Sequence, residues 1–152
     1  VDIHLHEPGE LGAFAMELIC ERTRALGVAG RVVISHGFAL GDLAPARADA
    51  VMALLAESGV ALCSTAAPSR PVPSRRRARA LGATLFAGND NIRDTWSPYG
   101  APDMLERAMF VGFKNNLRGD AGVAMAFATV AGEAARGCGF AGHGLAAGDR
   151  AD

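Results

Sequence analysis

In the segment Thr84-Leu85-Phe86-Ala87-Gly88-Asn89-Asp90-Asn91, an apolar run is followed at once by a glycine and a carboxylate. The run is typical of a short buried strand that ends at Gly88. A polar loop then spans residues 92–100 and holds the only Trp and the only Tyr of the chain. Parallel-sheet proteins place their chemistry at the carboxyl ends of buried strands, so Asp90 is a candidate functional residue. The alternative is that Asp90 only caps the turn.

Strand-like and helix-like segments alternate through the rest of the chain. Further strands are expected over residues 1–5, 31–36 and 60–64. Helices are expected over residues 10–26, 46–58, 75–81, 102–116 and 121–136. In the first helix, Leu11, Phe14 and Leu18 form the apolar stripe that we expect to face the core. This alternation predicts a parallel sheet with right-handed crossovers, either a small open sheet or half of an eight-stranded barrel.

Polar side chains at the strand ends favour the barrel. They are His4, His6 and Glu7 at the first strand, His36 at the second and Asp90 at the fourth. The carboxyl ends of the strands form the catalytic face of a TIM-like (β/α)8 barrel. Neither a GxGxxG nor a GxxxxGK[ST] motif is present, which counts against the nucleotide-binding open sheets. We therefore predict an α/β fold that is half of a TIM-like barrel.

Composition limits the classes of function. The 152 residues are one domain's worth of chain, and 50% of them are hydrophobic. A formal net charge of −1 gives no electrostatic footprint for nucleic acid or a membrane surface. The three cysteines are far apart, which predicts a reducing, cytoplasmic location, and no apolar run reaches membrane-spanning length. Because the chain begins inside a strand and stops in a turn, we expect it to be a piece of a longer protein.

The polar strand ends are suited to a hydrolytic metal site. Such a site needs imidazoles, a carboxylate and one position left for water, and His4 and Asp90 can supply part of this set. A carboxylate that contacts both the metal and the water can also accept the proton, which suits Asp90. His36 is placed to stabilise the hydroxide by hydrogen bonding, and Glu7 to carry protons towards a leaving amine. Each residue alone also fits a structural role, so the prediction depends on their combination.

With these residues in place, the sequence resembles the cytosine-deaminase-like branch of the amidohydrolase superfamily. The matching stretches are residues 2–7, Ser35-His36, 88–91, 94–100 and 103–105. The resemblance covers essentially the whole chain and implies the C-terminal half of the catalytic barrel, strands five to eight. Residues 1–143 would form this half, and residues 144–152 would begin the return to a small β domain.

The resemblance also implies roles for individual residues. His4 would be a ligand of one divalent ion, zinc or iron, and Asp90 would be both a ligand and the base. His36 would orient the hydroxide, and Glu7 would be the proton shuttle. Trp96 would line the substrate pocket. The reaction would be hydrolytic deamination, in which metal-bound hydroxide attacks a ring carbon of a nitrogen heterocycle and ammonia or an amine leaves.

Three positions depart from relatives that act on cytosine. These usually carry an acidic residue where His6 stands, histidine where Asn89 stands and aspartate where Asn91 stands. Asn91 is expected to contact the substrate, and its amide both donates and accepts hydrogen bonds where a carboxylate only accepts. Such a change can alter substrate choice by orders of magnitude. Cytosine-like heterocycles, aminotriazines and other cyclic amides therefore remain open as substrates.

Part of the family's site lies outside this chain. The first-strand His-x-His pair and a substrate-binding glutamine belong to the missing N-terminal half, so the fragment alone should show little or no turnover. Expected partners are that half and a small heterocycle, and a homo-oligomer is compatible with the sequence. One alternative is a non-catalytic α/β module that binds a small ligand without metal. Another is a neighbouring barrel family with a binuclear centre in which His36 is a ligand. The only lysine, Lys114, lies in a predicted helix, which counts against a carboxylated-lysine bridge.

Overall fold

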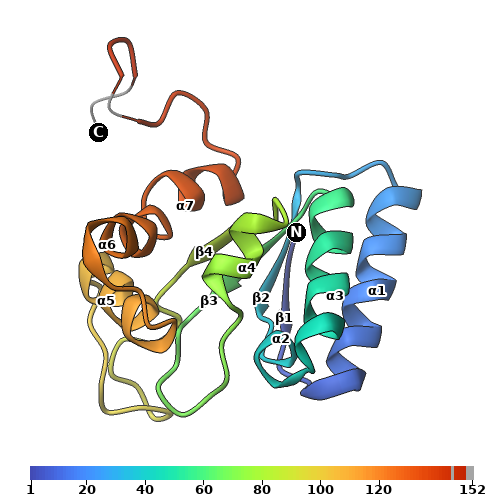
Figure 1. Cartoon of the computed structure of the whole chain (residues 1–152), viewed down its shortest axis with the longest axis horizontal. Coiled ribbons are helices and arrows are strands. Elements are labelled where there is room, and N and C mark those ends of the chain that lie inside the picture. Colours follow the sequence, from blue (N-terminus) through green and yellow to red (C-terminus); the bar gives the residue numbers. More distant parts are fainter. Residues whose placement is uncertain (145, 150–152) are drawn as a thin grey trace.

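A four-stranded parallel sheet forms the centre of the computed structural model, which describes residues 1–144 and 146–149. Its strands lie in the order of the sequence: β1 (Asp2–Leu5), β2 (Val32–His36), β3 (Val60–Ser64) and β4 (Leu85–Ala87) (Figure 1). The register pairs His4 with Ser35 and Leu5 with His36, so the polar ends of β1 and β2 are adjacent. The predicted parallel sheet is confirmed.

Helices lie beside this sheet in two groups. The first group is α1 (Gly9–Ala25), α2 (Ala39–Asp42), α3 (Pro45–Glu57) and α4 (Arg75–Ala80). The second follows β4 and consists of α5 (Met104–Lys114), α6 (Gly119–Ala128) and α7 (Gly132–Gly137). Figure 1 shows α1 and α3 on the β1–β2 side of the molecule and α5 to α7 on the β4 side. No helix in the described part of the chain is long and apolar enough to cross a membrane.

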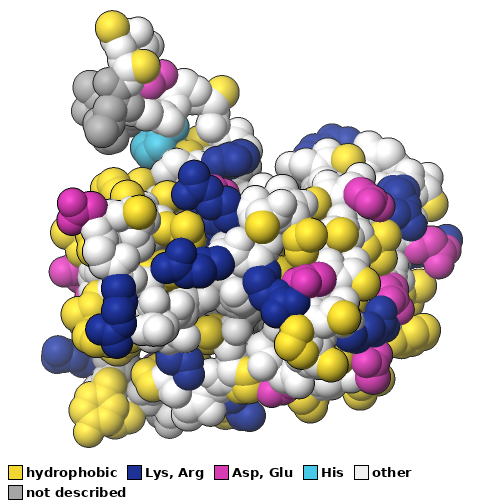
Figure 2. Space-filling view, in the orientation of Figure 1, with side chains coloured by type: hydrophobic (Ala, Val, Ile, Leu, Met, Phe, Trp, Pro, Cys, Tyr) yellow, Lys and Arg dark blue, Asp and Glu magenta, His cyan; other side chains and the backbone are white. Residues whose placement is uncertain are grey.

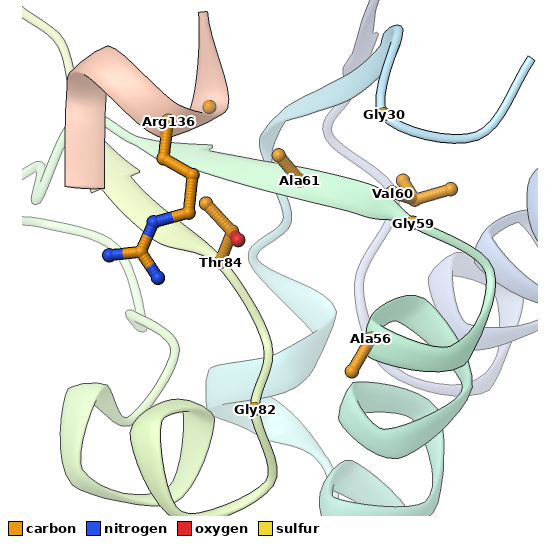
Figure 3. A pocket seen from close by; sticks show the side chains of 9 residues that line it. Gly30, Ala56, Gly59, Val60, Ala61, Gly82, Thr84 and Arg136 are labelled. Atoms are coloured by element: carbon orange, nitrogen blue, oxygen red, sulfur yellow. The ribbon is translucent and has the colours of Figure 1, made fainter. Parts of the chain in front are cut away.

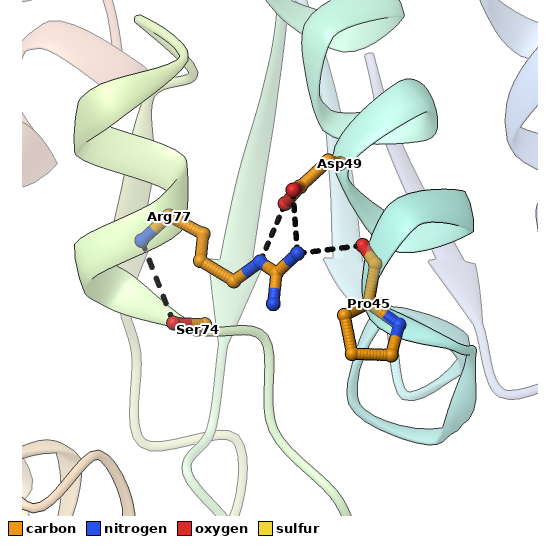
Figure 4. A network of polar contacts seen from close by, with 4 residues as sticks. All are labelled: Pro45, Asp49, Ser74 and Arg77. Carbon is orange, nitrogen blue, oxygen red and sulfur yellow. Dashed lines mark hydrogen bonds and ion pairs between the residues drawn. The ribbon is translucent and has the colours of Figure 1, made fainter.

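Local signals in the sequence set several helix starts. Pro45 occupies the first turn of α3, where its missing N–H costs nothing. Ser74 caps α4 by accepting a hydrogen bond from the backbone N–H of Arg77. The guanidinium of Arg77 also donates to the carboxylate of Asp49 and to the carbonyl of Pro45, which ties α4 to α3 (Figure 4).

The two faces of the sheet differ in character because successive side chains of a strand point to opposite sides. Ile34 and Leu62 belong to the apolar core that α1 and α3 complete with Met16, Met52 and Leu55. The register pairs His4 with Ser35 and Ser35 with Cys63, and these side chains point to the face opposite that of Ile34 and Leu62. This opposite face corresponds to the interior of a barrel and carries the polar side chains.

The predicted core stripe of α1 is wrong. Leu11, Phe14 and Leu18 are 63%, 62% and 47% exposed, and the buried face of the helix consists of smaller or more flexible side chains. A Cβ at Gly12 would lie 2.3 Å from the carbonyl oxygen of Glu7 and 2.6 Å from Cβ of Ala39. Close packing at Gly12 therefore buries that face of α1, and the face with Leu11, Phe14 and Leu18 is exposed to solvent.

Two other helix predictions also need correction. The four-residue helix α2 was not predicted, and the single helix expected over residues 121–136 is two helices, α6 and α7. The chain breaks at Thr129, whose hydroxyl donates to the carbonyl of Ala126 at 2.6 Å. The Thr129 carbonyl accepts a hydrogen bond from the backbone N–H of Ala87 at 2.9 Å. The break thus pairs the α6–α7 junction with the end of β4.

Helix α7 packs on β4 at a glycine, and this contact yields a prediction. A Cβ at Gly137 would lie 2.4 Å from Cδ1 of Phe86, a ring that is only 7% exposed. We expect Gly137→Ala to lower the free energy of unfolding by about 1–3 kcal/mol, as overpacked cores do. Gly132→Ala, in the same helix with no atom within 4 Å of the added Cβ, should leave it nearly unchanged. Equal denaturation midpoints for the two variants would contradict this packing.

The three cysteines should differ in reactivity. Burial raises the pKa of Cys63 to about 12 and also raises the pKa of the buried Cys20, so little reactive thiolate forms near neutral pH. Cys138 is exposed. We expect iodoacetamide to modify Cys138 first, as followed by peptide mass spectrometry. Labelling of Cys63 at the rate of Cys138 would show that this face of the sheet is open to solvent.

Candidate functional site

Three histidines meet at the carboxyl edge of the sheet. His4 lies on β1, His6 follows it, and His36 ends β2. One ring nitrogen from each lies within 4.8 Å of those of the other two. Nε2 of His36 is 3.2 Å from Nδ1 of His4, and the ring centroids of His6 and His36 are 4.1 Å apart. This spacing brings enough nitrogen donors together to contribute to a metal site.

His36 is held in a constrained and buried position. Its side chain is only 4% exposed, and its φ of 75° lies in the left-handed region that few non-glycine residues adopt. Burial lowers the pKa of His36, and the charge of His6 lowers it further, against the opposing carboxylate of Asp90. The imidazole is therefore neutral near pH 7 and has a nitrogen lone pair available.

Asp2 orients the histidine next to it. Its carboxylate accepts a hydrogen bond from the Ser35 hydroxyl at 2.8 Å and lies 3.3 Å from Nε2 of His4. Carboxylates that contact a ligating histidine fix its ring and tautomer. Asp2 was not predicted as a site residue, and His6 was predicted at this edge without a role in the site. The signal for Asp2 was its position two residues before His4, which places both on one face of the strand.

Asp90 reaches the same edge from β4. It lies three residues beyond the end of that strand, is exposed, and has a left-handed backbone with a φ of 64°. Its charge raises the pKa of His36, but its carboxylate is not among the three ligand groups that lie within 4.8 Å of one another, which are His4, His6 and His36. The structure brings His4 and His36 together, and Asp90 follows β4 at the same carboxyl edge of the parallel sheet.

The other predicted site residues lie around this edge. Glu7 is exposed two residues after β1. Asn91 donates through its amide to the carboxylate of Asp94, which in turn accepts from the backbone N–H groups of Trp96 and Ser97 at 2.9 and 3.0 Å. The Trp96 side chain is 84% exposed, so within this chain it projects from the loop and does not line an enclosed cavity. Of the predicted return segment 144–152, residues 145 and 150–152 lie outside the described residues.

A small pocket lies at the other end of the sheet. Its volume is about 150 Å³, and Figure 3 shows Gly59, Gly82 and Thr84 lining it together with Arg136. These residues belong to the turns that precede the strands and to α7. The pocket contains none of the histidines and no carboxylate, so it is separate from the candidate site.

Known proteins similar to this chain were found by sequence and by structure, although no family model matches it. The chain is 29% identical, over its whole length, to N-isopropylammelide isopropyl amidohydrolase of Pseudomonas sp. (strain ADP), of which it spans 38%. It is 32% identical over 109 residues to the uncharacterized protein YahJ of Escherichia coli (strain K12), of which that match spans 24%.

Solved structures of similar enzymes also match the fold of this chain. N-isopropylammelide isopropylaminohydrolase from Burkholderia multivorans superposes with a TM-score of 0.95 at 52% identity, and the match covers 99% of this chain and 39% of that one. For 5-methylcytosine deaminase from Klebsiella pneumoniae, at 23% identity, the TM-score is 0.83 over 40% of that chain, which supports the fold alone. The chain is thus similar over essentially its whole length to hydrolases of the amidohydrolase superfamily, of which it spans about two fifths, and its four strands are the C-terminal half of a TIM-like barrel.

Proposed function

We propose that this chain supplies half of the catalytic barrel of a metal-dependent hydrolase that removes an amine from an amino-substituted nitrogen heterocycle. The observation that carries the proposal is the cluster of His4, His6 and His36 at the carboxyl edge of a parallel sheet, the edge at which Asp90 follows β4. An aminotriazine-like substrate is favoured over a cytosine-like one. The reasons are the 52% identity to an isopropylammelide hydrolase and the amide of Asn91 at a position where cytosine enzymes carry aspartate.

The donor set fits a divalent ion such as zinc or iron. His4 offers an imidazole nitrogen and Asp90 a carboxylate, and both groups are donors that these metals bind. His6 and His36 hold further nitrogens within 4.8 Å of those of His4. The first-strand histidines of the missing half would complete the shell. A divalent ion held here would supply a water molecule of lowered pKa, which is a nucleophile near neutral pH.

Each residue of this chain has a role in that scheme. Asp90 accepts a proton from the attacking water, and the neutral His36 hydrogen-bonds the attacking oxygen. Glu7, exposed above the edge, carries protons to a ring nitrogen and to the leaving amine. Asp2 keeps the His4 ring in its orientation through the 3.3 Å contact.

Two residues of the loop after β4 would hold the heterocycle. One amide N–H of Asn91 is engaged by Asp94, which leaves the Asn91 carbonyl to accept from a ring N–H of the substrate. Trp96 would complete its pocket against the missing half, since most of its side chain is exposed here.

The missing half has surfaces to dock on. In the described sheet β1 and β4 are the edge strands, each paired on one side only. Leu11, Phe14 and Leu18 form an exposed apolar stripe on α1, the helix that follows the edge strand β1, and a helix of the missing half could pack there. We propose that the remaining strands pair with both edges and that a helix covers this stripe.

Amine release by the full-length protein tests the proposal. The purified protein would be loaded with zinc or with iron and assayed with N-alkylaminotriazines and with cytosine. We expect amine release that a chelator abolishes and added metal restores, faster with the triazines. Ligand binding without metal and without release of amine from any of these substrates would instead support a non-catalytic binding module.

A further inference from the structure

Arg107 is a buried charge next to the candidate site that neither the sequence analysis nor the proposed reaction uses. It lies on α5 and is only 8% exposed. Its Nε donates to Oδ1 of Asn89 at 3.1 Å, and its Nη1 donates to the carbonyl of Thr65. The guanidinium carbon also lies 5.4 Å from the centroid of the Phe110 ring.

Burying a guanidinium is unfavourable unless its surroundings compensate. Among the described residues, Arg107 makes no ion pair within 4.0 Å. Burial lowers its pKa, and the carboxylates of Glu106 and Asp90 oppose that change. The observed partners of the guanidinium are therefore neutral acceptors, and the charges of Glu106 and Asp90 favour its charged form.

The two hydrogen bonds of Arg107 join the carboxyl ends of neighbouring strands. Thr65 directly follows β3, and Asn89 directly precedes Asp90. Asp90 has a left-handed φ of 64°, a conformation that is uncommon outside glycine and that aspartate and asparagine adopt more readily than other residues. The carbonyl of Asn89 also accepts from the backbone N–H of Asn91 at 2.8 Å, so Asn89 anchors the turn on both sides of Asp90.

We propose that Arg107 is a positioning residue for Asp90. By gripping Asn89 and the Thr65 carbonyl together, it fixes the turn that presents the Asp90 carboxylate to the histidines. Arginine is required because its planar fork donates in two directions while its face rests on Phe110, which the single ammonium of lysine cannot do. The inference rests on the proposed function, because Asp90 has its role as a metal ligand only there.

The test compares Arg107→Lys and Asn89→Ala in the full-length protein by zinc affinity, kcat and thermal midpoint. We expect each variant to bind zinc about 10- to 100-fold more weakly, because loss of a residue that supports a metal ligand weakens metal binding by about that factor. The double variant should bind no more weakly than the worse single one, because both remove the same link. Arg75→Lys is the matched control. Arg75 is 2% exposed on α4 and is paired with Glu133 of α7 at 2.7 Å, and neither residue belongs to the candidate site, so its replacement should lower the thermal midpoint only.

Unchanged zinc affinity and kcat in Arg107→Lys and Asn89→Ala would overturn the inference, whatever the thermal midpoints. If Arg107→Lys fails to fold, Asn89→Ala alone decides. A parent protein that binds zinc but releases no amine would refute the proposed reaction and still leave the zinc affinities to judge Arg107. A structure of Asn89→Ala in which Asp90 keeps its left-handed backbone would also overturn the inference, independently of any activity.

Discussion

Asp90→Asn should lower kcat/KM of the full-length protein by about 1000-fold and also lower its affinity for the metal ion. Asparagine keeps the shape of the side chain and tolerates the left-handed backbone of residue 90, where φ is 64°. It lacks the charge that binds a cation and the basicity that accepts a proton from water. Steady-state kinetics and metal analysis by mass spectrometry would measure both losses.

The control for this variant is Asp120→Asn. Asp120 is an exposed aspartate in the first turn of α6, remote in sequence from every residue of the candidate site. Its replacement should leave kcat/KM and metal content at the parental values. If Asp90→Asn behaved like Asp120→Asn, Asp90 would be no more than a turn residue.

His36→Asn should lower kcat by about 100- to 10,000-fold while the metal stays bound. In the proposed site His36 hydrogen-bonds the attacking oxygen and is not needed to hold the ion. Asparagine tolerates the φ of 75° at this position, so the backbone next to Gly37 can persist. The measurement pairs kcat with the metal content of the same preparation.

Metal content separates this account from the binuclear alternative. In a binuclear centre His36 is a ligand, and His36→Asn would lose metal together with activity. His143→Asn is the control, because His143 is exposed in the tail after α7. Full activity in both histidine variants would remove His36 from the mechanism.

The strands and their polar ends could be predicted from the sequence because they depend on local patterns. The apolar runs over residues 60–64 and 84–87 coincide with β3 and β4 to within one residue. Once the sheet is parallel, its topology alone brings His4, His36 and Asp90 to one edge. Burial of α1 could not be predicted in the same way. Its larger stripe of Leu11, Phe14 and Leu18 gives the stronger periodic signal, yet close approach at Gly12 determines which side packs.

Tertiary contacts account for the other features that were missed. The break between α6 and α7 follows from the hydrogen bond between Ala87 and the carbonyl of Thr129, 42 residues later. Arg107 donates to the carbonyl of Thr65, also 42 residues away, and no spacing rule in the sequence marks that pair. Leu105, Phe113 and Val123 on α5 and α6 are also exposed, which the sequence pattern did not indicate. Figure 2 shows apolar side chains on the surface over this part of the molecule.

Anomalous diffraction from zinc-loaded crystals of the full-length protein tests the central claim most directly. The account predicts a single peak at the carboxyl edge of the sheet, with a His4 nitrogen and a carboxylate oxygen of Asp90 each about 2.0–2.2 Å from the ion. A peak elsewhere, or an ion at this edge that Asp90 does not touch, would contradict it.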